Sequence, residues 1–427
     1  MKVNPMLKSI KGVFRLFTIP PVHHTKDVDV SDITVNHPYG VPQAVISRLK
    51  EFLSEKNITA QNYKTQLAYL IDKFKTLDSY LIQRTDAAAQ QAKIFLDHGK
   101  FEYSEQMLKQ ALANNLTDSA NNAFLLAYIK VLQINAVETK KYYQQAVQLE
   151  PDNPLYLNVF GDYLYSLGEY TQAEPFFQHS LIITRKTLGR DHPDVAFNLN
   201  ILAELCKIQG HYSHAQPLYQ KSLAIREKAL GKNHPDVAQS LSNLAMLYFA
   251  QGEYSQAIPL CKRSAAIWRK TLGNDHPNVA QSLSNLALIY KAQGYHEKAE
   301  PLCQKSLAIR EKSLGKDHTD VAQSLNDLAL VYYAQGRYEK IERLCKRSLA
   351  IWEKELGKDH LDVTQSLNCL ALLYYAQGNY TKTESFIQRS LTILEKSLGK
   401  NHLKTQTARK NLRQLQARTH HSYDKVS

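Results

Sequence analysis

The stretch LGKNHPDVAQSLSNLA, residues 230–245, holds the pattern that decides the fold of this 427-residue chain. Its glycine recurs every 42 residues, and a histidine follows each copy three residues later; the glycines are Gly189, Gly231, Gly273, Gly315, Gly357 and Gly399. A second series with the same period consists of Gly168, Gly210, Gly252, Gly294, Gly336 and Gly378. Because glycine commonly ends a helix, two glycine series predict two helices in every unit.

One unit, residues 235–273, carries the pattern of a helical hairpin. Its first apolar stripe, with spacing i, i+3, i+4 and i+7, consists of Leu241, Leu244, Ala245 and Tyr248. A second stripe follows, consisting of Ala257, Leu260, Cys261, Ser264 and Ile267. Such spacing is typical of amphipathic helices. Since a lone hairpin cannot bury both stripes, we expect consecutive units to stack into a solenoid with one continuous core.

The spacing Leu-x2-Leu-Ala-x2-Tyr-x3-Gly-x-Tyr-x2-Ala in residues 241–257 resembles the tetratricopeptide repeat, whose usual period is about 34 residues. Residues 157–177 follow the same pattern after AVQLEPDNP (residues 146–154), and a weaker unit lies at about 86–118. The 42-residue form is similar to the long repeats of kinesin light chains and their relatives, bacterial ones included. The resemblance implies an all-α fold, a right-handed superhelical solenoid of tetratricopeptide-like helical hairpins.

The organisation that we expect along the chain has six segments. They are a flexible leader (1–43), a short helical N-terminal region (44–85), divergent tetratricopeptide-like repeats (86–153), tetratricopeptide repeats that include the 42-residue kinesin-light-chain-like units (154–402), a capping helix (403–417) and a flexible tail (418–427). Kinesin light chains place a long heptad coiled coil before their repeats, whereas residues 44–85 predict only one or two short amphipathic helices.

In tetratricopeptide arrays the first helix of each pair lines the concave groove, so the resemblance implies which columns of the repeat face a ligand. The residues that we assign to this peptide-binding groove are Asn200, Gln239, Ser242, Asn243, Phe249, Gln281, Asn285, Lys291, Gln323, Asn326, Tyr333, Asn368 and Tyr375. Most of them are amides, and aromatic side chains and a lysine flank the amides.

Amide side chains carry both a donor and an acceptor, so rows of Asn and Gln can pair with the backbone of an extended peptide. The flanking Phe249, Tyr333 and Tyr375 can hold apolar side chains of that peptide. The alternative is a solvated surface that is simply copied with each repeat, but Asn is a mediocre helix former, which favours a selected role. We therefore predict a protein–protein interaction scaffold that binds an extended peptide segment of a partner.

The repeated histidines do not predict a metal site. Packed helices lie about 8–10 Å apart and zinc ligands lie about 2 Å from the metal, so histidines of neighbouring units cannot share one ion. Gly231 can close one helix and Pro235 can open the next, which places His234 at or next to an N-cap. Phosphate-binding and nucleophile motifs are also missing from the sequence. We expect no catalytic residue, metal, cofactor, enzyme activity or small-molecule substrate.

Five cysteines form no C-x-x-C pair, which favours a reducing compartment. Cys261, Cys303 and Cys345 share a column that we expect to be buried, whereas Cys369 is predicted to face the groove and to be reactive. No segment approaches the roughly 20 apolar residues of a membrane helix, and the N-terminus lacks a signal-peptide cleavage site. We expect a cytoplasmic protein without a membrane partner.

The net charge of +13 is concentrated at the ends: residues 1–50 hold seven Lys and Arg against three Asp, and residues 401–427 hold six against one. Three alternatives to the peptide scaffold stay open. They are a kinesin-light-chain-like cargo adaptor, a structural protein that self-associates, and a helical repeat protein that binds nucleic acid. A nucleic-acid partner is the less favoured, because only Lys207 and Lys291 place positive charge in the predicted groove.

Overall fold

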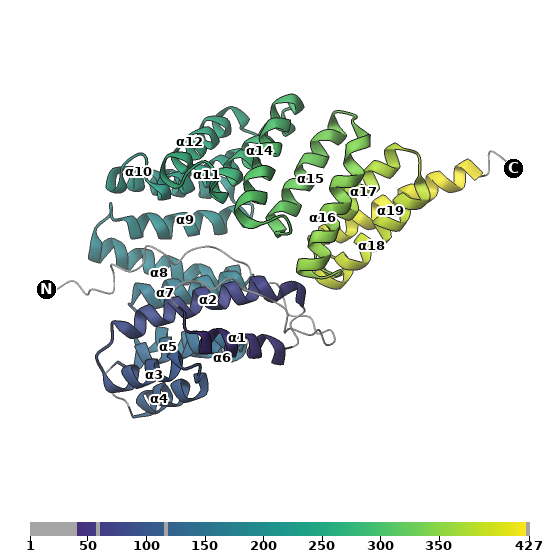
Figure 1. The fold of residues 1–427 in the computed structure, drawn as a ribbon. Helices are drawn as coiled ribbons and strands as arrows, with labels where there is room; N and C mark the ends of the chain where they lie inside the picture. Colours follow the sequence, from purple (N-terminus) through teal and green to yellow (C-terminus); the bar gives the residue numbers. More distant parts are fainter. Residues whose placement is uncertain (1–40, 57–59, 115–117, 424–427) are drawn as a thin grey trace. The chain divides into compact units, whose positions relative to one another are not determined.

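The computed structural model describes residues 41–56, 60–114 and 118–423 (Figure 1). All regular secondary structure in these residues is helical, so the expected all-α class is confirmed. Nearly all of the expected leader and the last residues of the expected tail lie outside the described residues. The chain divides into two compact units, residues 1–211 and 212–427, which we call the first and second units.

The first unit begins with two helices and continues as helical hairpins, in which consecutive antiparallel helices pack against each other. Its helices are α1 (Gln43–Glu55), α2 (Ala60–Ile82), α3 (Ala87–Asp97), α4 (Phe101–Ala113), α5 (Ser119–Leu132), α6 (Ala136–Leu149), α7 (Pro154–Ser166), α8 (Tyr170–Leu188) and α9 (Pro193–Ile208). The hairpins are α3–α4, α5–α6 and α7–α8. The helix α2 is not part of a hairpin and packs against α3 and α5.

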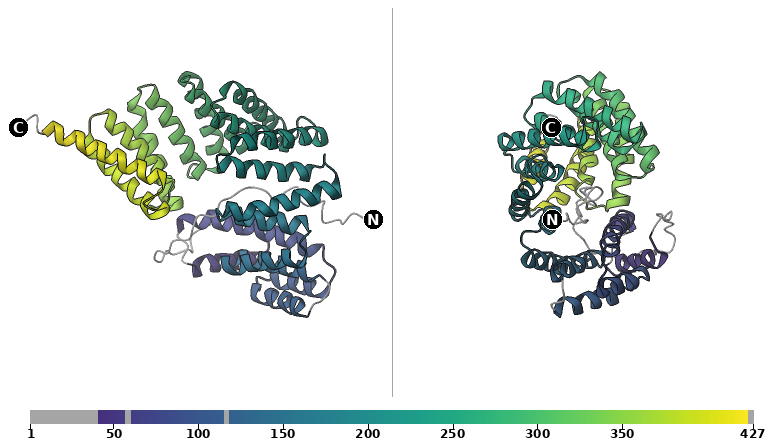
Figure 2. Two further views of the ribbon diagram at one scale, coloured as in Figure 1. Left: turned by 180° about the vertical axis from the view of Figure 1, so that it is seen from behind. Right: turned by 90° about the vertical axis from the view of Figure 1, so that its left-hand side faces the viewer.

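The second unit repeats the hairpin four times in chain order, as the colours from teal to yellow show in Figure 2. Its helices are α10 (Tyr212–Leu230), α11 (Pro235–Ala250), α12 (Tyr254–Leu272), α13 (Pro277–Ala292), α14 (His296–Leu314), α15 (Thr319–Ala334), the 3₁₀ helix η3 (Tyr338–Lys340), α16 (Ile341–Leu356), α17 (Val363–Ala376), α18 (Tyr380–Leu398) and α19 (Leu403–Tyr423). Each second helix also packs on the first helix of the next hairpin, so the hairpins form a continuous stack.

The repeated histidine lies at the start of the first helix of a hairpin: it is the N-cap of α9, α11, α13 and α15 and lies three residues before α17. His234 is the N-cap of α11, and its Nδ1 accepts a hydrogen bond of 3.1 Å from the backbone N–H of Asp236. The equivalent bonds recur at the other five histidines of the series, His192, His276, His318, His360 and His402. Since a neutral imidazole nitrogen satisfies a backbone donor that the helix leaves unpaired, the histidine is a structural cap, as the sequence predicts.

The cysteines of the second unit lie in the hydrophobic core between hairpins. Cys261, Cys303 and Cys345 are buried, as expected. The prediction that Cys369 faces a groove is wrong, because its thiol is buried beside that of Cys345 in the core between α16 and α17. The neighbouring Cys369 thiol and burial both raise the pKa of Cys345. An uncharged sulfur in this place behaves as a small apolar group and not as a nucleophile.

Candidate functional site

The first helix of each hairpin ends at a residue with positive φ, which gives a common reference for comparing the hairpins. In the second unit these residues are Gly252, Gly294, Gly336 and Gly378. Side chains 13, 10, 9, 6 and 3 positions before them follow one stripe along α11, α13, α15 and α17, with the exception of the buried Cys369. We call the surface formed by these positions the inner wall; it contains every residue of the second unit that the sequence assigns to the groove.

The inner wall of the second unit is only partly accessible. Gln239, Gln281, Gln365, Asn368 and Tyr375 are exposed. Half-buried side chains are Asn243, Phe249, Lys291, Gln323 and Tyr333, and buried ones are Ser242, Asn285 and Asn326. Asn200 lies in α9 of the first unit, where it is buried. The exposed and half-buried residues are therefore the ones that offer surface to a ligand.

The amide rows bond to each other along the helices. Gln239 Nε2 donates to Asn243 Oδ1 at 2.8 Å, and Gln281 Nε2 donates to Asn285 Oδ1 at 2.9 Å. A third bond of 2.9 Å, from Gln323 to Asp327, repeats the arrangement with a carboxylate as acceptor. Such i, i+4 pairs favour one arrangement of the two side chains, which lowers the conformational entropy that they lose when a ligand binds.

A chain of hydrogen bonds crosses from one hairpin to the next behind this surface. The buried Arg310 of α14 donates from Nη2 to Gln281 Oε1 at 2.7 Å, and Asn285 Nδ2 donates to Ser242 Oγ at 3.1 Å. Together with the bond from Gln281 to Asn285, these contacts link α14, α13 and α11. Burial lowers the pKa of Arg310, and Gln281 Oε1 compensates part of the hydration that its guanidinium loses.

Asn326 is engaged in the same manner farther along the stack. Its Nδ2 donates to Ser366 Oγ of α17 at 3.2 Å, and the Ser366 hydroxyl also lies 3.3 Å from Asn326 Oδ1. Asn326 and Asn285 therefore join neighbouring first helices, whereas the sequence analysis assigned both residues to a peptide-binding groove. Their identity in the sequence could not reveal this, because the partner serines come from other repeats.

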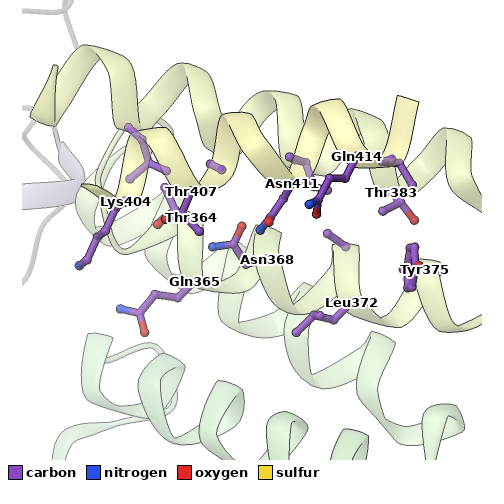
Figure 3. Close-up of a pocket in the computed structure, with 15 residues that line it drawn as sticks. Thr364, Gln365, Asn368, Leu372, Tyr375, Thr383, Lys404, Thr407, Asn411 and Gln414 are labelled. Carbon is purple, nitrogen blue, oxygen red and sulfur yellow. The ribbon is translucent and has the colours of Figure 1, made fainter. Parts of the chain in front are cut away.

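A cavity of about 710 Å³ opens at the last hairpin, between α17, α18 and α19. Figure 3 shows Asn368 of α17 beside Asn411 of α19, with Leu372 and Tyr375 farther along α17. Ala371, Ile387, Leu394 and Leu415 supply apolar lining, and Gln365, Gln414 and Lys404 add polar groups. An apolar cavity with a few converging polar groups is typical of a binding site. Asn368 and Tyr375, which the sequence analysis assigned to the groove, both line this cavity.

One column of the inner wall was missed by the sequence reasoning. The residues six positions before the positive-φ glycines are Met246, Leu288, Leu330 and Leu372. The first three are half-buried and Leu372 is 40% exposed. This column lies between the amide and aromatic columns, and its 42-residue period could have identified it in the sequence. It adds an apolar strip to a wall that the sequence described as mainly amide.

The aromatic column is close to the loops that end the first helices. Tyr333 packs on Tyr338 with ring centroids 5.7 Å apart, and Tyr375 packs on Tyr380 at 5.8 Å. Burial, together with the neighbouring Tyr338 and Tyr375, raises the pKa of Tyr333. Asp327 is half-buried on the same wall, and burial raises the pKa of its carboxyl against the opposing effect of Lys291 and Arg310. The wall is thus mostly uncharged, with isolated charges.

The described residues contain no group of three or more His, Cys, Asp or Glu side chains arranged to hold a metal ion. In that same part of the chain, no helix has the length and apolar character needed to cross a membrane.

The sequence matches a family model described as "Tetratricopeptide repeat" over residues 153–228, 214–260, 236–312, 282–354, 320–368 and 362–424. These overlapping matches extend without interruption from residue 153 to residue 424. The resemblance inferred from the repeat pattern is thereby confirmed. No curated protein matches the sequence.

Solved structures of similar fold include a tetratricopeptide repeat protein from Parabacteroides merdae, with 13% identity and a TM-score of 0.51, covering 70% of this chain and 98% of that one. A signal-transduction ATPase with a tetratricopeptide repeat sensor from Pyrococcus horikoshii has 15% identity and a TM-score of 0.52, covering 82% and 52% respectively. Repeats provisionally described as a kinesin light chain from Podospora anserina are 30% identical, with a TM-score of 0.42, covering 48% and 97%. The first two likenesses concern the fold alone, and the third, whose TM-score is below 0.5, supports no conclusion.

Proposed function

Since this chain belongs to the tetratricopeptide repeat family, we propose that it is a protein-interaction scaffold that binds an extended segment of a partner protein on the inner wall of its second unit. The family and the solved structures of similar fold support a protein-interaction scaffold in general. The cavity between α17, α18 and α19 is the observation that carries the more specific proposal.

The chemistry of the open wall suits a peptide. The exposed amides Gln365 and Asn368 can exchange hydrogen bonds with a peptide backbone, because each carries a donor and an acceptor. Leu372 and Tyr375 lie along the same helix and can bury apolar side chains of the segment. Asn243, Phe249, Lys291 and Tyr333 continue the surface along the preceding hairpins, while the buried Asn285 and Asn326 keep the hairpins in register.

The test uses a displayed library of random 12-residue peptides selected on the whole protein. Leu372→Glu places a charge in the apolar strip, and we expect it to weaken the selected peptides at least about tenfold, or 1.4 kcal/mol. The matched control is Leu272→Glu, because Leu272 is 41% exposed, close to the 40% of Leu372, but lies at the end of the second helix α12. Equal binding to both variants and to wild type would sink the proposal.

The extended conformation is tested on the same peptides. A proline inside a bound helix removes a hydrogen bond and introduces a clash, whereas an extended segment accommodates proline at positions whose N–H is not bonded. We expect several positions of a selected peptide to accept proline with less than a threefold loss of affinity. Loss of binding at every position would show that the wall holds a helix.

A further inference from the structure

The inner wall of the first unit is covered at α5, whereas the inner wall of the second unit is partly accessible. The positive-φ residues Gly99, Ile134 and Gly168 end α3, α5 and α7, and six positions before them lie Lys93, Tyr128 and Asp162. Tyr128 is 1% exposed, whereas Leu372 at the same position of the last hairpin is 40% exposed. Every residue of α5 from 120 to 132 is buried. A helix buried all round needs packing partners on both sides.

The helix α2 supplies the cover. Its Tyr80 packs edge-on against Phe124 and Tyr128 of α5, with ring centroids 5.3 Å and 5.8 Å apart. These two residues lie ten and six positions before Ile134, so both belong to the inner wall. On the same side of α2, Leu70, Phe74 and Leu77 are buried completely. The apolar stripe of α2 therefore packs against a surface that corresponds in position to the inner wall of the second unit.

In the neighbouring hairpins the same column carries charges in place of the aromatic residue, and these charges interact with α2 by an ion pair at α3 and electrostatically at α7. Lys93 Nζ of α3 lies 2.6 Å from Asp78 Oδ1 of α2. On α7, burial raises the pKa of Asp162 to about 6, and Lys73 of α2 acts against that rise. Asp162 in turn contributes to the raised pKa of Tyr69 in α2. One column in three successive hairpins thus interacts with a single helix.

We infer that the inner wall of the first unit is a helix-binding surface and that α2 is its ligand within the same chain. The surface takes an amphipathic helix with an aromatic residue over α5 and with charges opposite to those of Lys93 and Asp162. Because α2 packs on α3 and α5, it excludes a partner segment from the wall that these two helices form. The inference is independent of the proposed function, since it concerns other residues and another ligand.

A helix that is docked as a ligand can dissociate from the wall while the hairpins stay folded. A helix that is part of the hairpin stack unfolds together with its neighbours. Native-state hydrogen exchange of the whole chain, followed by mass spectrometry at increasing denaturant, separates these cases. We expect amides of α2 to exchange at least about tenfold faster than those of α5 in the absence of denaturant. A single opening that releases α2, α5 and α7 together at every denaturant concentration would overturn the inference.

A second experiment supplies the ligand from outside. The probe is a fluorescent synthetic peptide of residues 60–82, added to the full chain carrying Leu70→Glu and Leu77→Glu, which remove the apolar stripe of α2. We expect the peptide to bind this variant at least about tenfold more tightly than wild type, because a tethered helix acts at an effective concentration near the millimolar range. The matched control carries Ala68→Glu and Lys75→Glu, on the exposed face of α2, and should behave as wild type.

The controls keep both outcomes interpretable. A peptide with Tyr80→Glu should bind none of the proteins, since its aromatic contact with α5 is lost. If the double variant keeps the helicity of its hairpins and the unaltered peptide still fails to bind, the inference is wrong. If the double variant unfolds, hydrogen exchange of the wild-type chain decides.

Discussion

Two charged residues, Asp162 and Arg310, lie where most of their hydration is lost. Arg310 keeps its charge satisfied by donating to Asp320 O, Ser324 Oγ and Gln281 Oε1. Burial raises the pKa of Asp162 to about 6, with Lys73 as the opposing charge. Desolvation thus shifts the pKa of each residue in the direction that favours its neutral form. Arg310 counters this effect with three hydrogen bonds from its two Nη atoms, although its buried Nε donates to none of the described groups.

Asp162 gives a pH-dependent prediction for the first unit. Its folded-state pKa of about 6 exceeds the ordinary value of 3.8, so its stabilising contribution is complete below pH 3.8 and is lost as pH rises through 6. We expect Asp162→Asn, which mimics the protonated acid, to raise the free energy of unfolding at pH 7.5 by up to about 3 kcal/mol. Thermal denaturation at pH 7.5 and at pH 5 measures this difference.

The stabilising effect of Asp162→Asn should shrink at pH 5, because the wild-type carboxyl is then largely protonated in the folded state. Asp72→Asn, on the exposed face of α2, is the control and should change the melting temperature little at either pH. An Asp162→Asn variant that is no more stable than wild type at pH 7.5 would contradict the assignment.

At the scale of helices, a row of ion pairs joins successive second helices of the second unit. Glu227 of α10 pairs with Arg263 of α12 at 2.5 Å, and Glu311 of α14 pairs with Arg347 of α16 at 2.6 Å. The pair Glu353–Arg389 continues the row between α16 and α18. Arg269 of α12 and Lys305 of α14 occupy the positions that the 42-residue period makes equivalent to Glu227 and Arg263; we call each such pair of positions a rung of the row. Two positive charges therefore occupy a rung that elsewhere holds opposite charges.

We predict that Arg269→Glu restores this rung. A partly exposed ion pair contributes up to about 1 kcal/mol, so the free energy of unfolding should rise by about that amount at low salt. The increase in the free energy of unfolding should be smaller at 1 M salt, where the Debye length is about 3 Å and the ion pair is screened. Urea denaturation at both salt concentrations measures the effect. Lys270→Glu, at the adjacent exposed position, serves as the control; an equal gain there would assign the effect to net charge and not to the rung.

For the whole molecule, stability comes from neighbour-to-neighbour stacking, so the last hairpin needs a cover. The helix α19 provides it: Leu412 and Leu415 are buried, and Arg409 pairs with Glu395 of α18 at 2.5 Å. The sequence expectation placed the capping helix at 403–417, and α19 extends to Tyr423. A terminal repeat without a polar outer cover exposes its apolar side to other molecules.

Removal of α19 should therefore cause self-association. We expect a chain that ends after His402 to show an apparent mass that increases with concentration in light scattering, because α17 and α18 lose their cover. A chain that ends after Tyr423 is the control and should scatter like the full chain. A truncation after His402 that stays monomeric and equally stable would show that α19 is dispensable for the stack.

The sequence by itself determined the hairpin, its 42-residue phase, the histidine cap and the buried cysteine column, because helix periodicity and helix ends depend on residues only a few positions apart. It also identified the wall positions that carry Asn368 and Tyr375. Only the tertiary structure decided which amides lie at the surface and which, like Asn285 and Asn326, join hairpins. It also decided that α2 closes the wall of the first unit. Both outcomes depend on packing between residues about 40 or more positions apart, such as Tyr80 with Phe124 and Asn326 with Ser366, which no local pattern specifies.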